Sequence, residues 1–122
     1  MDHDAATRFA RDWLDAWNAH DIEAVLAHFA DDAVFASPVA QRVFPGSDGV
    51  LRGKPAIRDY WTRALERMPE LRFALLGVYA GVGIVVIHYR NQAGGLVNEV
   101  LVLDADGPDG AVVSGYGTYA VP

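Results

Sequence analysis

The chain has 122 residues, of which 52% are hydrophobic and 21% charged, a composition that indicates one folded globular core rather than a disordered chain. Its 16 acidic residues outnumber 10 basic ones, and the net charge of −6 argues against nucleic acid or an anionic membrane as a partner. It has no cysteine, no apolar run of about 18 residues and no signal-peptide pattern at its start. We therefore expect a single domain over residues 1–122 in the cytoplasm.

Three segments of the first half have the apolar periodicity of amphipathic helices. The first covers residues 5–19, and the second follows at once, with Asp21 as a typical N-terminal cap. The third starts with Pro55 in its first turn and ends before Pro69. Between the second and third helices we expect a short strand, 33–37, and a long loop, 38–53, with one short strand near 50–52.

The second half is predicted to form four strands, because it contains four runs of β-branched and aromatic residues that are separated by Gly or Asp-Gly turns. The expected strands cover residues 71–80, 83–90, 96–104 and 111–120. Helices first and strands later indicate an α+β fold, in which three helices pack on a strongly curved, mostly antiparallel sheet.

Two of these strands are apolar on both faces, at 84–89 and 96–103. A sheet covered by helices on one face normally shows polar residues on the other. A strongly curved sheet that shields part of both faces is one explanation. A second copy of the chain is the other, and we expect a homodimer through the sheet, because exposed apolar patches of this size are unusual in monomers.

Four strings together resemble the nuclear transport factor 2-like superfamily, and in particular its SnoaL-like and ketosteroid isomerase-like members. They are AWNAHDIEAVLAHFADDAVFASP, LRGKPAIRDYW, EVLVLDADG and GYGTYA, and they cover most of the chain. The resemblance implies a cone in which a bent sheet wraps a long helix around an apolar pocket. It also implies homodimers formed through the outer sheet face.

The ketosteroid isomerase pattern is only partly retained. The position of that enzyme's general base, before a proline, is Ser37, and the position of its oxyanion-binding tyrosine is Trp13. The position of its protonated aspartate is Glu99. Only one of the three functional groups is kept, so the resemblance does not imply steroid isomerisation.

Glu99 also stands out without the resemblance, because a charged residue within an apolar strand is uncommon. A symmetric turn over NQAGG would pair Asn91 with Leu96 and bring His88 directly opposite Glu99 on one face. An imidazole beside a carboxylate in an apolar cleft is a candidate catalytic pair for proton transfer. A structural hydrogen bond between the two is the alternative, and a one-residue shift of the register would separate them.

A cone places its core and its pocket lining on a shared wall, so aromatic residues of the helices are candidates for ligand binding as well as for the core. The expected ligand-binding residues are Trp13, Trp17, Phe35, Ser37, Val39, Phe44, Trp61 and Tyr116. The four histidines have no metal-ligand spacing, and neither a phosphate-binding loop nor a dinucleotide fingerprint occurs. We therefore expect neither a metal nor a cofactor.

Three functions remain open at this point. The first is a cofactor-free pocket protein that binds a mostly apolar small molecule and catalyses proton transfer, as an isomerase, dehydratase or cyclase. The second is a non-catalytic binding or dimerisation module with the same pocket. The third is a domain that binds a protein partner with its outer sheet face.

Overall fold

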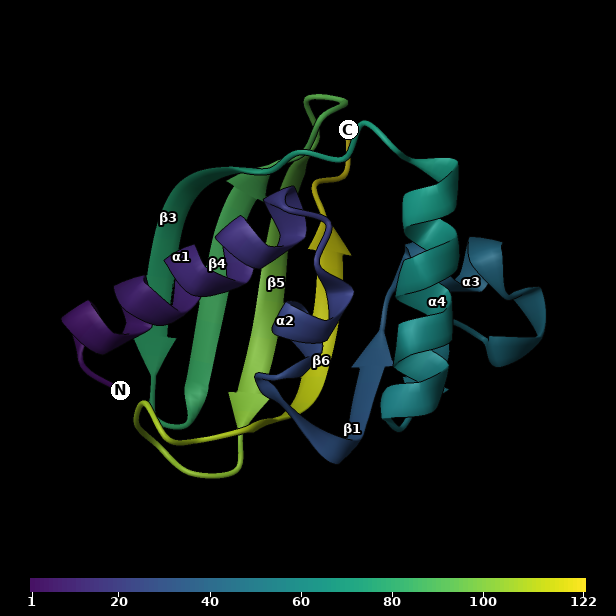
Figure 1. Cartoon of the computed structure of the whole chain (residues 1–122). Coiled ribbons are helices and arrows are strands. Elements are labelled where there is room, and N and C mark those ends of the chain that lie inside the picture. The colour runs from purple at the N-terminus through teal and green to yellow at the C-terminus, as the bar shows by residue number, and fades with distance from the viewer.

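A computed structural model describes all residues, 1–122, and has helices on one face of a strongly curved six-stranded sheet (Figure 1). The helical elements are α1 His3–Asn18, α2 Ile22–Leu26, α3 Pro38–Val43, the short 3₁₀ helix η1 Pro45–Ser47 and α4 Lys54–Arg67. The strands are β1 Phe29–Ala36, β2 Val50–Arg52, β3 Ala74–Gly81, β4 Ile84–Arg90, β5 Leu96–Leu103 and β6 Val112–Tyr119. No helix is both long enough and apolar enough to span a membrane.

The strand order is β2-β1-β6-β5-β4-β3, and every neighbouring pair is antiparallel except β1 and β6. The parallel pair joins the N-terminal part of the sheet to the C-terminal meander. This arrangement confirms the predicted α+β class, and the short strand predicted near residues 50–52 is β2.

The region 38–53 differs from the prediction of a loop with one strand, because it also contains α3 and η1. Ser37 caps α3: its Oγ accepts a hydrogen bond of 3.1 Å from the backbone N–H of Val39, and Pro38 occupies the first turn. A six-residue helix is too short to show apolar periodicity, so only the Ser-Pro pair could have indicated it.

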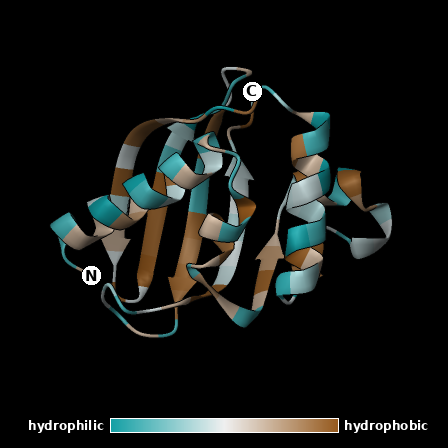
Figure 2. Cartoon of the chain, viewed as in Figure 1, coloured by the Kyte–Doolittle hydropathy of each residue, from teal (hydrophilic) through white to brown (hydrophobic).

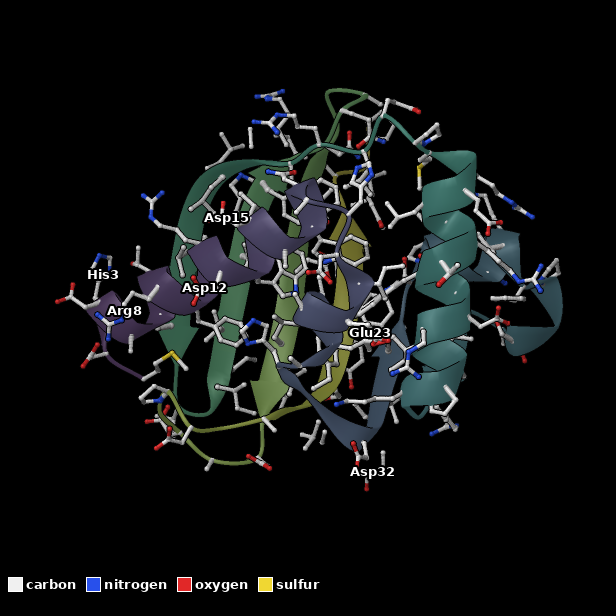
Figure 3. The ribbon with its side chains drawn as sticks, viewed as in Figure 1. His3, Arg8, Asp12, Asp15, Glu23 and Asp32 are labelled. Carbon is white, nitrogen blue, oxygen red and sulfur yellow. The ribbon has the colours of Figure 1, made fainter.

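The N-terminal helices begin where the capping rules predict. The carboxylate of Asp2 accepts the N–H of Ala5 at 2.8 Å, and that of Asp21 accepts the N–H of Ala24 at 3.1 Å. Glu23 of α2 points toward α4, and its carboxylate binds Arg58 of that helix with a closest distance of 2.5 Å (Figure 3). The ion pair ties α2 to α4 at the surface.

The core lies between the helices and the concave face of the sheet. Apolar residues concentrate on the strands (Figure 2), and the helices add buried apolar residues such as Trp13 and Trp61. Its most completely buried side chains come from both layers: Trp13, Leu26 and Ile57 from the helices, and Val85, Ile87 and Leu101 from the sheet. Burial on this scale is the main source of stability, at about 1.5–3 kcal/mol for each large apolar side chain.

The outer face of the sheet carries a row of apolar residues. The register aligns Tyr79 with Val86, Val86 with Val100, and Val100 with Tyr116 across four strands. Tyr79 and Tyr116 are 61% and 43% exposed in the single chain. Val86 and Val100 between them are partly exposed.

Candidate active site

The hairpin between β4 and β5 contradicts the predicted His88–Glu99 pair. Ile87 stands opposite Glu99, and His88 stands opposite Asn98. Successive side chains of a strand point to opposite faces, so His88 and Glu99 lie on different sides of the sheet. The predicted pair is wrong by one residue of register.

The turn explains the difference. The backbone N–H of Asn91 bonds to the carbonyl oxygen of Gly95 at 2.9 Å, so Asn91 faces Gly95 instead of Leu96. Gly94 adopts a left-handed conformation, with φ of +84°, and the Asn91 side-chain oxygen accepts the N–H groups of Ala93 and Gly95. The loop therefore has three residues, with glycine at the left-handed position that such loops require.

His88 is held on the outer face by its own strand partners. Its Nδ1 lies 3.1 Å from the carbonyl oxygen of Val97, which fits an N–H donor on the ring. The imidazole is therefore outside the site that contains Glu99.

Glu99 points into the core, where it is 5% exposed. Its actual partner is Tyr89, whose hydroxyl donates a hydrogen bond of 2.9 Å to Oε1. Tyr89 stands opposite Val97, two residues from Glu99, so the two side chains are diagonal neighbours on one face. Burial raises the pKa of Glu99 to about 7, and the Tyr89 hydrogen bond acts in the opposite direction.

Glu99 lies in the wall of a cavity of about 480 Å³ between the helices and the sheet. The predicted residues Trp13, Trp17, Phe35, Val39 and Trp61 line this cavity with it. The aromatic rings form a continuous packed wall, with ring-centre distances of 4.9 Å for Trp17–Trp61, 5.8 Å for Trp13–Tyr89 and 4.2 Å for Phe73–Tyr89. The space therefore suits an apolar, ring-sized molecule.

Three of the predicted ligand-binding residues do not line this cavity. Tyr116 stands opposite Val100 on the outer face of the sheet. Phe44 borders a separate hollow, where the Arg63 guanidinium lies 5.4 Å from the centre of its ring. Ser37 is buried, and its Oγ accepts the N–H of Val39 to cap α3.

Three tyrosines that were not predicted as site residues line the cavity: Tyr60, Tyr89 and Tyr119. Burial raises the pKa of each phenol, and the nearby Glu99 carboxylate raises it further. They are therefore neutral hydroxyl groups at physiological pH. Tyr60 could have been found from its place beside Trp61 on an apolar helix stripe, whereas Tyr89 and Tyr119 depend on strand register.

Three buried side-chain polar atoms of the chain have no hydrogen-bond partner: Nε1 of Trp13, Nε1 of Trp17 and Oε2 of Glu99. All three belong to residues that line the same cavity. An unsatisfied buried donor or acceptor costs about 1–3 kcal/mol, so such groups are rare in folded proteins. Their concentration here marks the cavity as the candidate site. No three His, Asp or Glu side chains lie together as a metal site would require.

Several solved structures are similar to this chain in fold. A crystal structure of a SnoaL-like protein of unknown function from Burkholderia thailandensis is 41% identical over 99% of each chain, with a TM-score of 0.88. An NTF2-like protein of unknown function from Burkholderia pseudomallei is 16% identical over 95% of this chain and 91% of its own, with a TM-score of 0.66.

TerC, which was co-crystallised with polyporic acid, is 15% identical over 95% of this chain and 92% of its own, with a TM-score of 0.70. None of the curated proteins matches the sequence. The sequence model of the SnoaL-like domain family matches residues 10–121, which is nearly the whole chain. The chain therefore belongs to the SnoaL-like domain family.

Proposed function

We propose that the protein binds a mostly apolar small molecule in the aromatic cavity and catalyses proton transfer on it, with Glu99 as the group that takes and returns the proton. One observation carries this proposal: Glu99 is buried in the cavity wall, with Oε1 held by Tyr89 and Oε2 unpartnered. A carboxyl with a pKa of about 7 is available in both forms near neutral pH, which suits a general acid–base catalyst.

The other unpartnered atoms suggest where the reacting group would lie. The indole N–H groups of Trp13 and Trp17 can donate hydrogen bonds to a carbonyl oxygen of the ligand. Oε2 of Glu99 would remove a proton from the carbon next to that carbonyl, and the C–H electron pair would move toward the carbonyl oxygen. If the ligand has a β,γ double bond, the electron pair spreads over a dienolate, and return of the proton to the γ carbon gives the α,β-unsaturated isomer without a co-reactant.

Two further observations support a small-molecule role. The cavity volume of about 480 Å³ lies within the usual range of ligand sites, roughly 300–1,000 Å³. TerC, which shares the fold, was crystallised with the small molecule polyporic acid.

A binding role without catalysis is the second candidate. It is favoured by the surroundings of Glu99, because the other titratable groups of the cavity wall near it are tyrosines with raised pKa values. Without a second acid–base group of moderate pKa nearby, Glu99 would have to remove the proton and return it by itself.

Deuterium exchange tests the proposal directly. The ketone 2-tetralone is incubated with the protein in D₂O, and the loss of its α-proton signal is followed by ¹H NMR. Catalysis by Glu99 predicts that Glu99→Gln slows the protein-dependent exchange by roughly 10²–10⁴-fold. His88→Gln is the matched control, since His88 is on the other face of the same hairpin. Equal rates for wild type and Glu99→Gln would refute catalysis by Glu99, whereas ketone binding without faster exchange would favour the binding role.

A further inference from the structure

The cavity differs in charge from the rest of the molecule. The chain has 16 acidic and 10 basic residues, yet the charged residues that line the cavity are one acid, Glu99, and two bases, Arg42 and Arg67. Acids are exposed elsewhere, for example Asp12 and Asp15 on the solvent side of α1 (Figure 3). With Glu99 protonated, the cavity is therefore a positive region in a negative protein.

Neither of these two arginines forms an ion pair or a hydrogen bond within the chain. Three other basic residues do pair with carboxylates: Lys54 with Asp31, Arg58 with Glu23 and Arg63 with Asp59. The positive charge beside the cavity is thus left for solvent or for a ligand to neutralise.

The positions of both side chains place this charge at the rim of the cavity. Arg42 is in the last turn of α3 and Arg67 is in the last turn of α4, and both are largely exposed. A cation at a helix C-terminus also has an ordinary structural role with the helix dipole. However, the charge of Arg42 extends into the cavity, because it lowers the pKa of Tyr60 and Tyr119 against the larger effect of burial, which raises both.

We propose that the natural ligand is an apolar carboxylate, whose charged group lies at the rim against the guanidinium of Arg42, with Arg67 adding to the positive field, and whose apolar body lies among the aromatic rings. This inference rests on the proposed function, since both use the same cavity. A guanidinium has a fork of donors that matches a carboxylate, and charged hydrogen bonds are about twice as strong as neutral ones. The inner end of the cavity, beside Glu99, favours a neutral part of the ligand, because a second negative charge there would repel Glu99 once Glu99 ionises.

Calorimetric titration of the full chain with two matched probes tests whether the cavity prefers a carboxylate. The probes are 2-naphthoate and 2-naphthamide, which share a ring system and differ in charge, and pH 6 keeps the acid ionised while Glu99 is mostly protonated. We expect the carboxylate to bind roughly ten-fold more tightly than the amide. Arg42→Gln should remove most of that preference, and Arg67→Gln a smaller part. Added salt should weaken binding of the carboxylate alone.

Arg52→Gln is the control variant, because Arg52 is an exposed arginine of β2 that does not line the cavity, and its loss changes the net charge by the same amount. Equal affinity for the two probes would overturn the proposal while leaving the apolar site intact. An equal loss of carboxylate binding in Arg52→Gln and Arg42→Gln would also overturn it, since net charge alone would then explain the preference. Failure of both probes to bind would overturn this inference together with the proposed small-molecule site.

Discussion

The hydroxyl of Tyr89 on β4 donates a hydrogen bond of 2.9 Å to Oε1 of Glu99 on β5, and both side chains are buried on the concave face of the sheet. The bond holds one carboxyl oxygen in place, while Oε2 of this cavity-lining residue has no hydrogen-bond partner. It also limits how far burial raises the pKa of the carboxyl, because it favours the ionised form.

Removal of the Tyr89 hydroxyl should raise the pKa of the Glu99 carboxyl. In Tyr89→Phe, the effect of burial on the pKa is no longer opposed, so the pKa should rise above its wild-type value of about 7. The change is measured by ¹³C NMR of the Glu99 carboxyl in labelled protein across pH 5–9. Any catalytic activity assigned to Glu99 should move to higher pH by the same amount. An unchanged pKa would mean that the hydrogen bond does not stabilise the carboxylate.

The stability of the protein should depend on pH through Glu99. Its pKa rises from 4.5 to about 7 on folding, so the folded state binds more protons than the unfolded state between these values. This contribution is fully present below pH 4.5 and is lost as the pH rises through about 7, at a total of about 3 kcal/mol.

Urea unfolding at pH 4.5 and pH 8 tests this dependence, with Glu99→Gln as the comparison. The variant has no titrating group at this position and should lack this part of the pH dependence, so wild type should lose more stability than the variant between the two pH values. The difference between the proteins isolates Glu99, since other groups titrate alike in both. Parallel profiles would contradict a buried Glu99 with a raised pKa.

The outer row of Tyr79, Val86, Val100 and Tyr116 should mediate a homodimer, because it is apolar and its two tyrosines are exposed in the single chain. Light scattering after gel filtration should report about twice 13.2 kDa. Tyr116→Glu should reduce this to one chain without unfolding the protein, because Tyr116 is already 43% exposed.

Val82→Glu is the control for that experiment. Val82 is 93% exposed in the turn before β4 and is outside the row, so this variant should remain dimeric. A wild-type monomer at micromolar concentration would contradict the dimer and leave the row free for another protein partner.

Much of the architecture could be predicted from the sequence, because helix stripes, caps and apolar strands are local patterns. The stripe of Trp13 and Trp17 indicated correctly the buried face of the first helix, and Asp21 indicated correctly the start of the second. The resemblance carried by four short strings indicated the SnoaL-like family, which the sequence model confirms over residues 10–121. These features depend on residues close in sequence.

The composition of the site depended on tertiary structure. A three-residue loop around Gly94, with two N–H groups accepted by the Asn91 side chain, shifts the hairpin by one residue. Because side chains alternate along a strand, this shift removes His88 from the cavity and makes Tyr89 the partner of Glu99. The rim charge also depends on the fold, since Arg42 and Arg67 come to one cavity only when α3 and α4 pack around it. The sequence by itself determined the helices, their apolar faces and the strands, whereas the tertiary structure decided which strand residues face the cavity and which of them meet, because register and helix packing join residues that are distant in the chain.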